Sequence, residues 1–309
     1  MKSQETILIL GGSGLLGHHC YEQLKMDFNV IQTYNSHISD KTNSEFFSIE
    51  QKSKLENIFL RYKPKAIINT IALVTVDGCE LNPKKAKVMN SEFVSYLVDM
   101  MKKTGLSDSH LLQISSASIY GIKEEGDIKP WVETDDTKPI SVYANTKLDG
   151  ELSARKHQGP LTILRTDFYG INPLSEKSLL WWIINRATNG EVMDGWENIH
   201  FSPVSATKLA NILAQIIQNN IEGVFNAGCK NACNKYDFAK TVCDLINIQG
   251  KVKKTRLLQD KELIRPDYTV LNSTKLNALI DMNFSWQEDL SIYMKNLPKL
   301  PKNLSIKLN

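Results

Sequence analysis

The sequence predicts an α/β protein built on a doubly wound parallel sheet, with a smaller C-terminal part. Short apolar runs alternate with segments of helical periodicity up to about residue 170. The first apolar run, Ile7 to Leu10, leads directly into three glycines and then into a helical pattern. Beyond about residue 170, loops and short elements dominate. These three observations favour an open parallel sheet with helices on both faces, followed by a less regular region.

The glycine corner after the first expected strand has the spacing of a phosphate-binding turn. Gly11 permits a tight turn, Gly14 lets the backbone approach a diphosphate, and Gly17 lets the helix pack close to the strand. The helix N-terminus adds unpaired N–H groups and a partial positive charge. Three glycines alone are a weak signal, but directly after an N-terminal strand they predict a dinucleotide site, with Ser13 and Leu15 in the same turn.

The remaining elements follow in regular order. The expected strands lie near residues 6–10, 28–33, 45–49, 66–71, 110–115, 161–165 and 223–226. The expected helices lie near residues 15–25, 51–61, 84–104, 141–157, 177–189, 205–219, 235–247 and 286–296. This order predicts a dinucleotide-binding Rossmann domain at residues 1–170, with residues 201–228 returning to it. Residues 171–200 and 229–309 are then expected to form a smaller substrate-binding domain.

Composition and charge exclude several classes of protein. The 309 residues are 42% hydrophobic and 23% charged, which is typical of a globular enzyme. A net charge of +3 without a basic run gives no reason to expect nucleic acid or a membrane surface as partner. The chain has no apolar stretch of about 18 residues and no signal-peptide pattern, so we expect a cytoplasmic protein. Its five cysteines are scattered, and Cys229 and Cys233 lack a second ligand pair, so we expect free thiols and no metal site.

The end of the second expected strand indicates the cofactor. A carboxylate there would accept hydrogen bonds from both ribose hydroxyls and favour NAD. The chain has uncharged polar residues instead, namely Tyr34, Asn35, Ser36 and His37. No acid repels a 2′-phosphate, so the sequence mildly favours NADPH over NADH. Further cofactor contacts are expected after the third and fourth strands, from Ile49, Thr70, Ile71 and Ala72.

Two clusters of side chains carry candidate chemistry. Tyr143 and Lys147 are four residues apart on an expected helix and share one face, although ordinary helices often have this spacing by accident. An ammonium beside a phenol draws the phenol pKa down from about 10, which would make Tyr143 a general acid. Ser115, Ser116 and Ser118 follow the fifth strand, where such sheets bind ligands, and a hydroxyl there can bond a substrate carbonyl; the alternative is a serine-rich turn. No serine lies in a G-x-S-x-G turn, which excludes that class of hydrolase.

Ordered motifs extend over nearly the whole chain. They are the glycine turn at 11–17, TVDGCELNP at 75–83 followed by Asn90, ISSASIYG at 114–121, PISVYANTKLDGE at 139–151, FSPVSATKLA at 201–210, KYDFAK at 235–240 and RPDYTVLNSTKL at 265–276. This ordered set resembles the extended short-chain dehydrogenase/reductases and, within them, the dTDP-4-dehydrorhamnose reductase family.

The resemblance implies hydride transfer from NADPH to the 4-keto carbon of a nucleotide-linked 6-deoxy sugar, in surface polysaccharide or deoxysugar biosynthesis. It implies Ser116 as the catalytic hydroxyl, Tyr143 as the acid, and Lys147 as the residue that tunes Tyr143 and binds the nicotinamide ribose. Asn90 is either a proton-relay residue or a buried helix hydrogen bond. The expected substrate contacts are Val74, Ser118, Phe168 and Arg265. Arg265 would contact the phosphates or form a surface ion pair, and the family allows a homodimer.

Departures from the family pattern leave the nucleotide and the sugar open. Ala117 and Ser118 stand where the family has Asp and Tyr, and Phe168 stands where it has Trp. Ala117 and Ser118 cannot protonate a leaving hydroxyl, which excludes a 4,6-dehydratase. Although the missing ribose carboxylate argues against it, an epimerase that retains NAD⁺ stays open as an alternative. So does a non-catalytic NADP-binding subunit, like the regulatory partner of methionine adenosyltransferase, although the three candidate catalytic side chains are all present.

Overall fold

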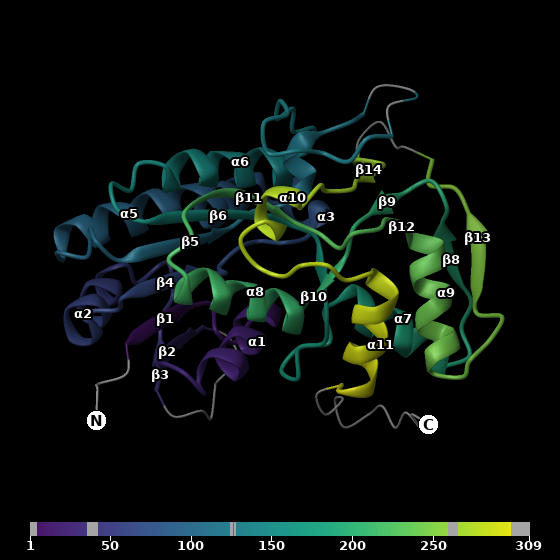
Figure 1. Ribbon diagram of the computed structural model, residues 1–309, viewed down its shortest axis with the longest axis horizontal. Helices are drawn as coiled ribbons and strands as arrows, with labels where there is room; N and C mark the ends of the chain where they lie inside the picture. Colours follow the sequence, from purple (N-terminus) through teal and green to yellow (C-terminus); the bar gives the residue numbers. More distant parts are fainter. Residues whose placement is uncertain (1–4, 36–42, 124–125, 127, 259–264, 298–309) are drawn as a thin grey trace.

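The computed structural model describes residues 5–35, 43–123, 126, 128–258 and 265–297. In this part of the chain a seven-stranded parallel sheet forms the centre (Figure 1). Its strands are β1 (Thr6–Leu10), β2 (Asn29–Tyr34), β3 (Ser44–Phe46), β4 (Ala66–Asn69), β5 (His110–Ile114), β6 (Leu161–Thr166) and β11 (Gly223–Ala227). Their spatial order is β11-β6-β5-β4-β1-β2-β3. The order reverses between β1 and β4, and this switch point is where open α/β sheets bind ligands. The predicted fold class is confirmed.

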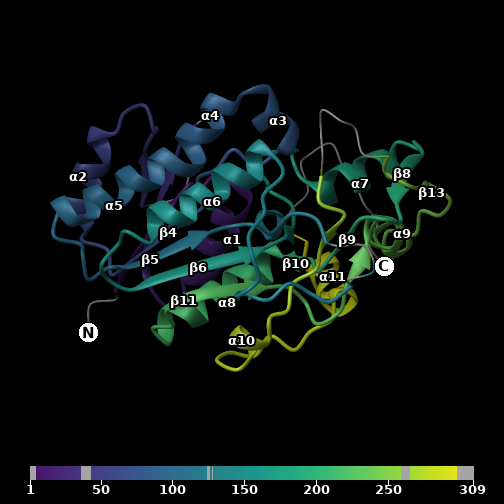
Figure 2. The same cartoon turned by 90° about the horizontal axis from the view of Figure 1, so that it is seen from above.

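Helices cover both faces of the sheet, as Figure 2 shows from above. One face carries α1 (Leu15–Leu24) and α8 (Ala206–Gln218), and the other carries α2 (Ser53–Tyr62), α5 (Phe93–Lys103) and α6 (Val142–Ala154). The side chains of β1 alternate between two buried clusters, because successive strand residues point to opposite faces. Ile7 and Ile9 pack in the cluster that contains α1 and α8, whereas Leu8 and Leu10 pack with α2 and α5.

A second group of elements lies beyond the carboxyl ends of the central strands (Figure 1). Its strands are β7 (Phe168–Tyr169), β8 (Met193–Trp196), β9 (His200–Phe201), β10 (Val204–Ser205), β12 (Cys233–Asn234), β13 (Val252–Thr255) and β14 (Tyr268–Thr269). Its helices are α7 (Leu179–Thr188), α9 (Lys235–Leu245) and α11 (Trp286–Lys295), whereas α10 (Thr274–Asn277) lies beside β11 of the central sheet (Figure 2). Most of these strands are two residues long, and among the described residues they form small sheets such as β12-β9-β14.

The segment predicted as one helix at 84–104 differs from the expectation. It consists of α4 (Pro83–Lys87), a π-helical turn η1 (Val88–Glu92) and then α5, and it is preceded by a further helix, α3 (Val76–Leu81). Gly150 of α6 explains the close packing here, because a Cβ at this position would lie 2.2 Å from the Asn90 carbonyl oxygen. None of the helices in the described residues is long and apolar enough to cross a membrane.

Candidate active site

The glycine corner is held from both sides by the neighbouring strands. Gly11 has a φ of +85°, and its N–H donates to Thr33 Oγ1 of β2 at 2.9 Å. On the other side, Thr70 Oγ1 donates to the Leu10 carbonyl oxygen at 2.7 Å. A Cβ at Gly17 would lie 2.2 Å from the Gly11 carbonyl oxygen, so the close approach of α1 to the loop requires glycine here.

The residues of this corner fit a dinucleotide. Gly14 is the N-cap of α1 and supplies no side-chain cap, so the helix N-terminus is left to an anionic ligand. At the end of β5, Ser115 Oγ is buried and has no hydrogen-bond partner in the described structure, as expected beside a ligand that supplies one. Ser13 and Leu15 flank the cap, and Ser13 O accepts a hydrogen bond from Asn172 Nδ2 at 2.9 Å.

The expected adenosine end is formed by strand ends. Tyr34 closes β2 and packs edge-on against Phe46 of β3, with ring centroids 5.8 Å apart. Asn35 is exposed, and neither residue carries a negative charge. Ser36 and His37 lie outside the described residues. Ile49 follows β3 and is half-buried against the core.

The loop after β4 is tied to the catalytic helix by Asn90. Its Oδ1 accepts from the Leu73 N–H at 2.8 Å, and its Nδ2 donates to Leu73 O and to Thr146 Oγ1, both at 3.1 Å. The loop includes Ile71 and Ala72, which are expected cofactor contacts, so Asn90 fixes the position of these residues relative to α6. These contacts are those of a buried helix hydrogen bond, one of the two alternatives for Asn90, and the proton-relay role stays a prediction.

Three candidate catalytic side chains converge at the carboxyl end of β5. Ser116 Oγ accepts from the Ser118 N–H at 3.2 Å, and the Ser116 hydroxyl lies close enough to the Tyr143 phenol to lower its pKa. One helical turn further along α6, Lys147 Nζ donates to the Ile114 carbonyl oxygen at 2.5 Å. The ammonium, the phenol and the hydroxyl therefore meet at the sheet edge next to the glycine corner.

The pKa values of the two α6 groups both move away from their ordinary values. Burial raises the pKa of Tyr143 to about 12, although the hydrogen bond from Ser116 opposes the rise. Burial lowers the pKa of Lys147 to about 8, and the Glu151 carboxylate partly opposes that change. Burial outweighs the lowering contributions to the pKa of Tyr143, and the tuning of this pKa by Lys147 stays a prediction. Tyr143 is a protonated phenol at neutral pH, as a proton donor must be.

A buried ion pair joins α6 to β6 of the central sheet. Glu151 lies one turn after Lys147, and Arg165 of β6 donates to both of its carboxylate oxygens, at 3.0 Å from Nε and 2.8 Å from Nη2. Arg165 also donates to Tyr120 Oη at 2.9 Å. Arg165 thus connects the end of β6 with α6 and with Tyr120 after β5. Glu151 was missed, although its position four residues after Lys147 was a usable signal.

The expected substrate residues surround this centre at different depths. Val74 is 62% exposed, Ser118 is half-buried in the short 3₁₀ turn η2 (Ala117–Tyr120), and Phe168 of β7 packs against the core. Arg265 forms an ion pair with Asp77 of α3. Sequence reasoning missed Asp167 and Lys235 as members of the same region, although Lys235 begins the KYDFAK motif, because the motifs do not show which distant residues meet in the fold.

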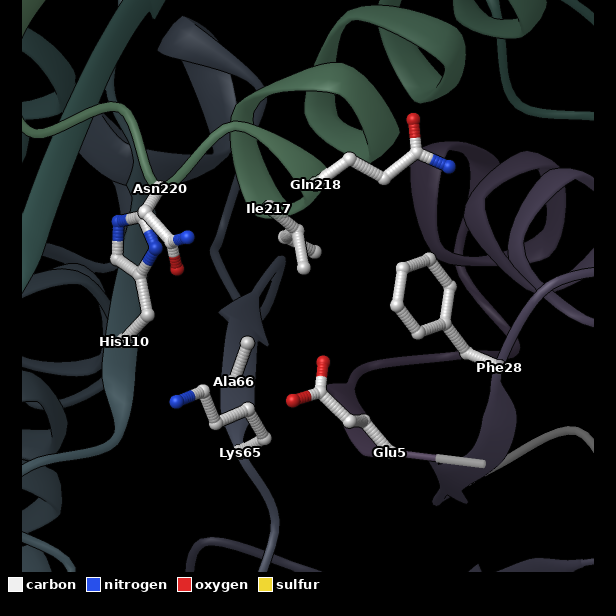
Figure 3. Close-up of a pocket in the computed structure, with 8 residues that line it drawn as sticks. All are labelled: Glu5, Phe28, Lys65, Ala66, His110, Ile217, Gln218 and Asn220. Carbon is white, nitrogen blue, oxygen red and sulfur yellow. The ribbon is translucent and has the colours of Figure 1, made fainter. Parts of the chain in front are cut away.

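A separate cavity of about 270 Å³ lies at the opposite edge of the sheet, toward the amino ends of the strands (Figure 3). It is lined by Glu5, Phe28, Lys65, Ala66, His110, Ile217, Gln218 and Asn220. Burial lowers the pKa of His110 to about 4, and its Nε2 is hydrogen-bonded to Thr162 Oγ1. None of the candidate catalytic side chains lines this cavity, so it is separate from the active site.

The fold and the site together define a dinucleotide-binding protein of the short-chain dehydrogenase/reductase type. The family model of the RmlD substrate binding domain matches residues 5–298, and the chain belongs to this family. A dTDP-4-dehydrorhamnose reductase of Aggregatibacter actinomycetemcomitans is 27% identical over 291 residues, which are 89% of this chain and 90% of that protein.

Solved structures show the same fold. The dTDP-4-dehydrorhamnose reductase of Clostridium acetobutylicum has a TM-score of 0.79 at 26% identity, covering 94% of this chain and 99% of that one. The enzyme of the same name from Bacillus anthracis, solved with NADP, has a TM-score of 0.81 at 20% identity, covering 95% and 99%. The family expected from the sequence motifs is confirmed.

Proposed function

We propose that this chain is an NADPH-dependent reductase of a nucleoside-diphosphate-linked 4-keto-6-deoxy sugar, in surface polysaccharide or deoxysugar biosynthesis. The observation that carries the proposal is the convergence of Ser116, Tyr143 and Lys147 at the carboxyl end of β5, beside an open glycine corner. The relatives named as dTDP-4-dehydrorhamnose reductases support the same reaction and substrate class.

The side chains of the site divide the work as follows. The bound cofactor supplies the hydride to the carbonyl carbon. Ser116 holds the carbonyl oxygen by a hydrogen bond, and Tyr143 donates its proton to that oxygen as negative charge develops on it. A phenol whose pKa is raised to about 12 keeps its proton at neutral pH until the much more basic alkoxide forms. Lys147 binds the ribose beside the nicotinamide and holds a positive charge close to the reacting oxygen.

The cofactor preference follows from the end of β2. Tyr34 and Asn35 offer polar groups without negative charge, so a 2′-phosphate meets no repulsion there. We expect tighter binding of NADPH than of NADH, measured by calorimetry with both cofactors. Tighter NADH binding would contradict this reading of the strand end.

The decisive experiment follows NADPH oxidation with a panel of nucleoside diphosphate 4-keto-6-deoxy sugars. We expect turnover with at least one member of the panel. NADPH binding without turnover on any of them would overturn the reductase proposal in favour of a non-catalytic binding subunit. Interconversion of epimers with catalytic NAD⁺ and no net oxidation would indicate the epimerase alternative instead.

A further inference from the structure

One carboxylate close to the catalytic phenol has no role in the reaction as described above. Asp167 follows β6 directly, and Thr269 Oγ1 of β14 donates to its Oδ2 at 2.6 Å. Its carbonyl oxygen accepts from the Val204 N–H of β10 at 3.0 Å. The main chain and one carboxylate oxygen are therefore fixed, and within the described residues the other oxygen, Oδ1, has no hydrogen-bond partner.

An ammonium group follows β12, the other outer strand of the β12-β9-β14 sheet to which Thr269 belongs. Lys235 begins α9 directly after β12, and its N–H donates to the Ile199 carbonyl oxygen at 3.1 Å. Its Nζ lies 3.3 Å from the ring centroid of Phe201. Phe201 of β9 pairs with Cys233 on one side and with Thr269 on the other. The β12-β9-β14 sheet thus brings together Lys235, which lies over the Phe201 ring, and Thr269, which is paired with Phe201 and holds Asp167.

The two opposite charges interact without touching. The carboxylate of Asp167 favours the charged form of Lys235, and the ammonium does the same for Asp167, while burial raises the pKa of Asp167 and lowers that of Lys235. No ion pair or hydrogen bond joins them in the described structure. Two half-buried charges held apart leave their hydrogen-bonding capacity unused. A hydroxyl between them would donate to the carboxylate and accept from the ammonium.

The position relative to Tyr143 indicates which hydroxyl this is. β5 and β6 are paired in parallel with Ile114 opposite Leu164, and the Ser115 N–H donates to the Leu164 carbonyl oxygen at 2.8 Å, so Asp167 and Ser116 follow neighbouring strands at the same end of the sheet. The charge of Asp167 also contributes to the raised pKa of Tyr143. Tyr143 contacts the carbonyl oxygen of the substrate, so a neighbouring group reaches a substituent on an adjacent ring carbon. We propose that Asp167 is a specificity-determining residue that accepts a hydrogen bond from the sugar hydroxyl on the carbon next to the carbonyl group, while Lys235 donates to that hydroxyl. This inference rests on the proposed function.

The test compares two substrates in the full-length protein. One is the 4-keto-6-deoxy sugar nucleotide that the panel identifies, and the other is its 3-deoxy analogue, which lacks the hydroxyl next to the carbonyl. We expect Asp167→Ala to lower kcat/KM for the parent by about 10-fold to 100-fold, the range for a hydrogen bond to a charged group. The natural protein is expected to lose a similar factor on the analogue, and Asp167→Ala is expected to lose nothing further on it.

Controls separate specificity from folding and from the reductase proposal. Asp167→Asn keeps the shape of the side chain and is expected to show the same pattern of kcat/KM values in weaker form. Asp194→Asn, on the exposed surface of β8, should leave kcat/KM unchanged for both substrates. NADPH affinity should stay unchanged in all variants. An equal loss on both substrates, or no loss on either, would overturn the role of Asp167 while the reductase function stands. Absence of turnover by the natural protein on the whole panel would instead overturn the proposed function, and the inference with it.

Discussion

The two sides of the active site are built in different ways. On the cofactor side, neighbouring strands of the central sheet hold the functional groups through contacts with main-chain atoms. Thr33 accepts from the Gly11 N–H, Thr70 donates to the Leu10 carbonyl oxygen, and Lys147 donates to that of Ile114. A central parallel sheet buried on both faces gives these contacts little freedom to change.

On the sugar side, the functional groups lie at the ends of two-residue strands and in loops. Lys235 follows the two-residue strand β12, Asp167 lies between β6 and the two-residue strand β7, and Arg265 lies outside regular structure. Their side chains make contacts such as the hydrogen bond from the Thr269 hydroxyl to Asp167. A single substitution can therefore change recognition on this side without disturbing the sheet. The difference predicts that cofactor binding follows from the fold, whereas the choice of sugar depends on a few side chains.

The largest effect should come from removing the phenol at the boundary of the two sides. Tyr143→Phe deletes the proton donor and leaves the glycine corner intact, so we expect kcat to fall by about 10²-fold to 10⁴-fold, the range for general acid catalysis. NADPH affinity should change little in a fluorescence titration. Tyr96→Phe is a matched control, because the Tyr96 hydroxyl donates to Lys52 O on the protein surface. Unchanged turnover by Tyr143→Phe would exclude this residue as the acid.

Next in size is a defect confined to the cofactor side. Gly17→Ala places a Cβ about 2.2 Å from the Gly11 carbonyl oxygen, so α1 or the loop must move. We expect NADPH affinity to fall by at least about 10-fold, since the diphosphate binds at the N-terminus of α1 and this helix must pack close to the loop to present it. Gly105→Ala is the control: its added Cβ meets no atom within 4 Å, but its φ of +74° predicts a stability cost alone. Equal cofactor affinity in both variants would show that the tight corner is not required.

How far the sequence predicts the molecule follows the same division. The alternation of strands and helices, the glycine corner and the Tyr143–Lys147 pair were predictable, because each is visible as a pattern within short segments. The π-helical turn at Asn90 was not, because it forms against Gly150 of another helix. The sheet of β9, β12 and β14 was not predictable either. Two-residue strands carry no periodicity of their own, and only long-range pairing brings Lys235 near Asp167.

A smaller effect is a pH dependence of NADPH affinity, which should identify Lys147 as a residue that binds the cofactor. With its pKa lowered to about 8, the ammonium is charged below that pH and neutral above it. NADPH affinity should therefore be constant near pH 7 and weaken as the pH rises through about 8, in titrations at constant ionic strength. Lys147→Met should bind weakly at every pH and lose this dependence. A Lys147→Met profile with the same step would assign the titration to another group.

The smallest effect concerns the outer edge of the sugar side. The ion pair of Arg265 with Asp77 is largely exposed, so its loss should lower the free energy of unfolding by less than about 1 kcal/mol in urea denaturation. The two alternatives for Arg265 then separate in kinetics. If Arg265 contacts the phosphates, the KM for the sugar nucleotide should rise several-fold in Arg265→Ala. In Asp77→Ala the KM should stay unchanged, because that substitution leaves the guanidinium in place. Equal effects of the two substitutions would assign Arg265 to its ion pair with Asp77 and remove it from the expected substrate contacts.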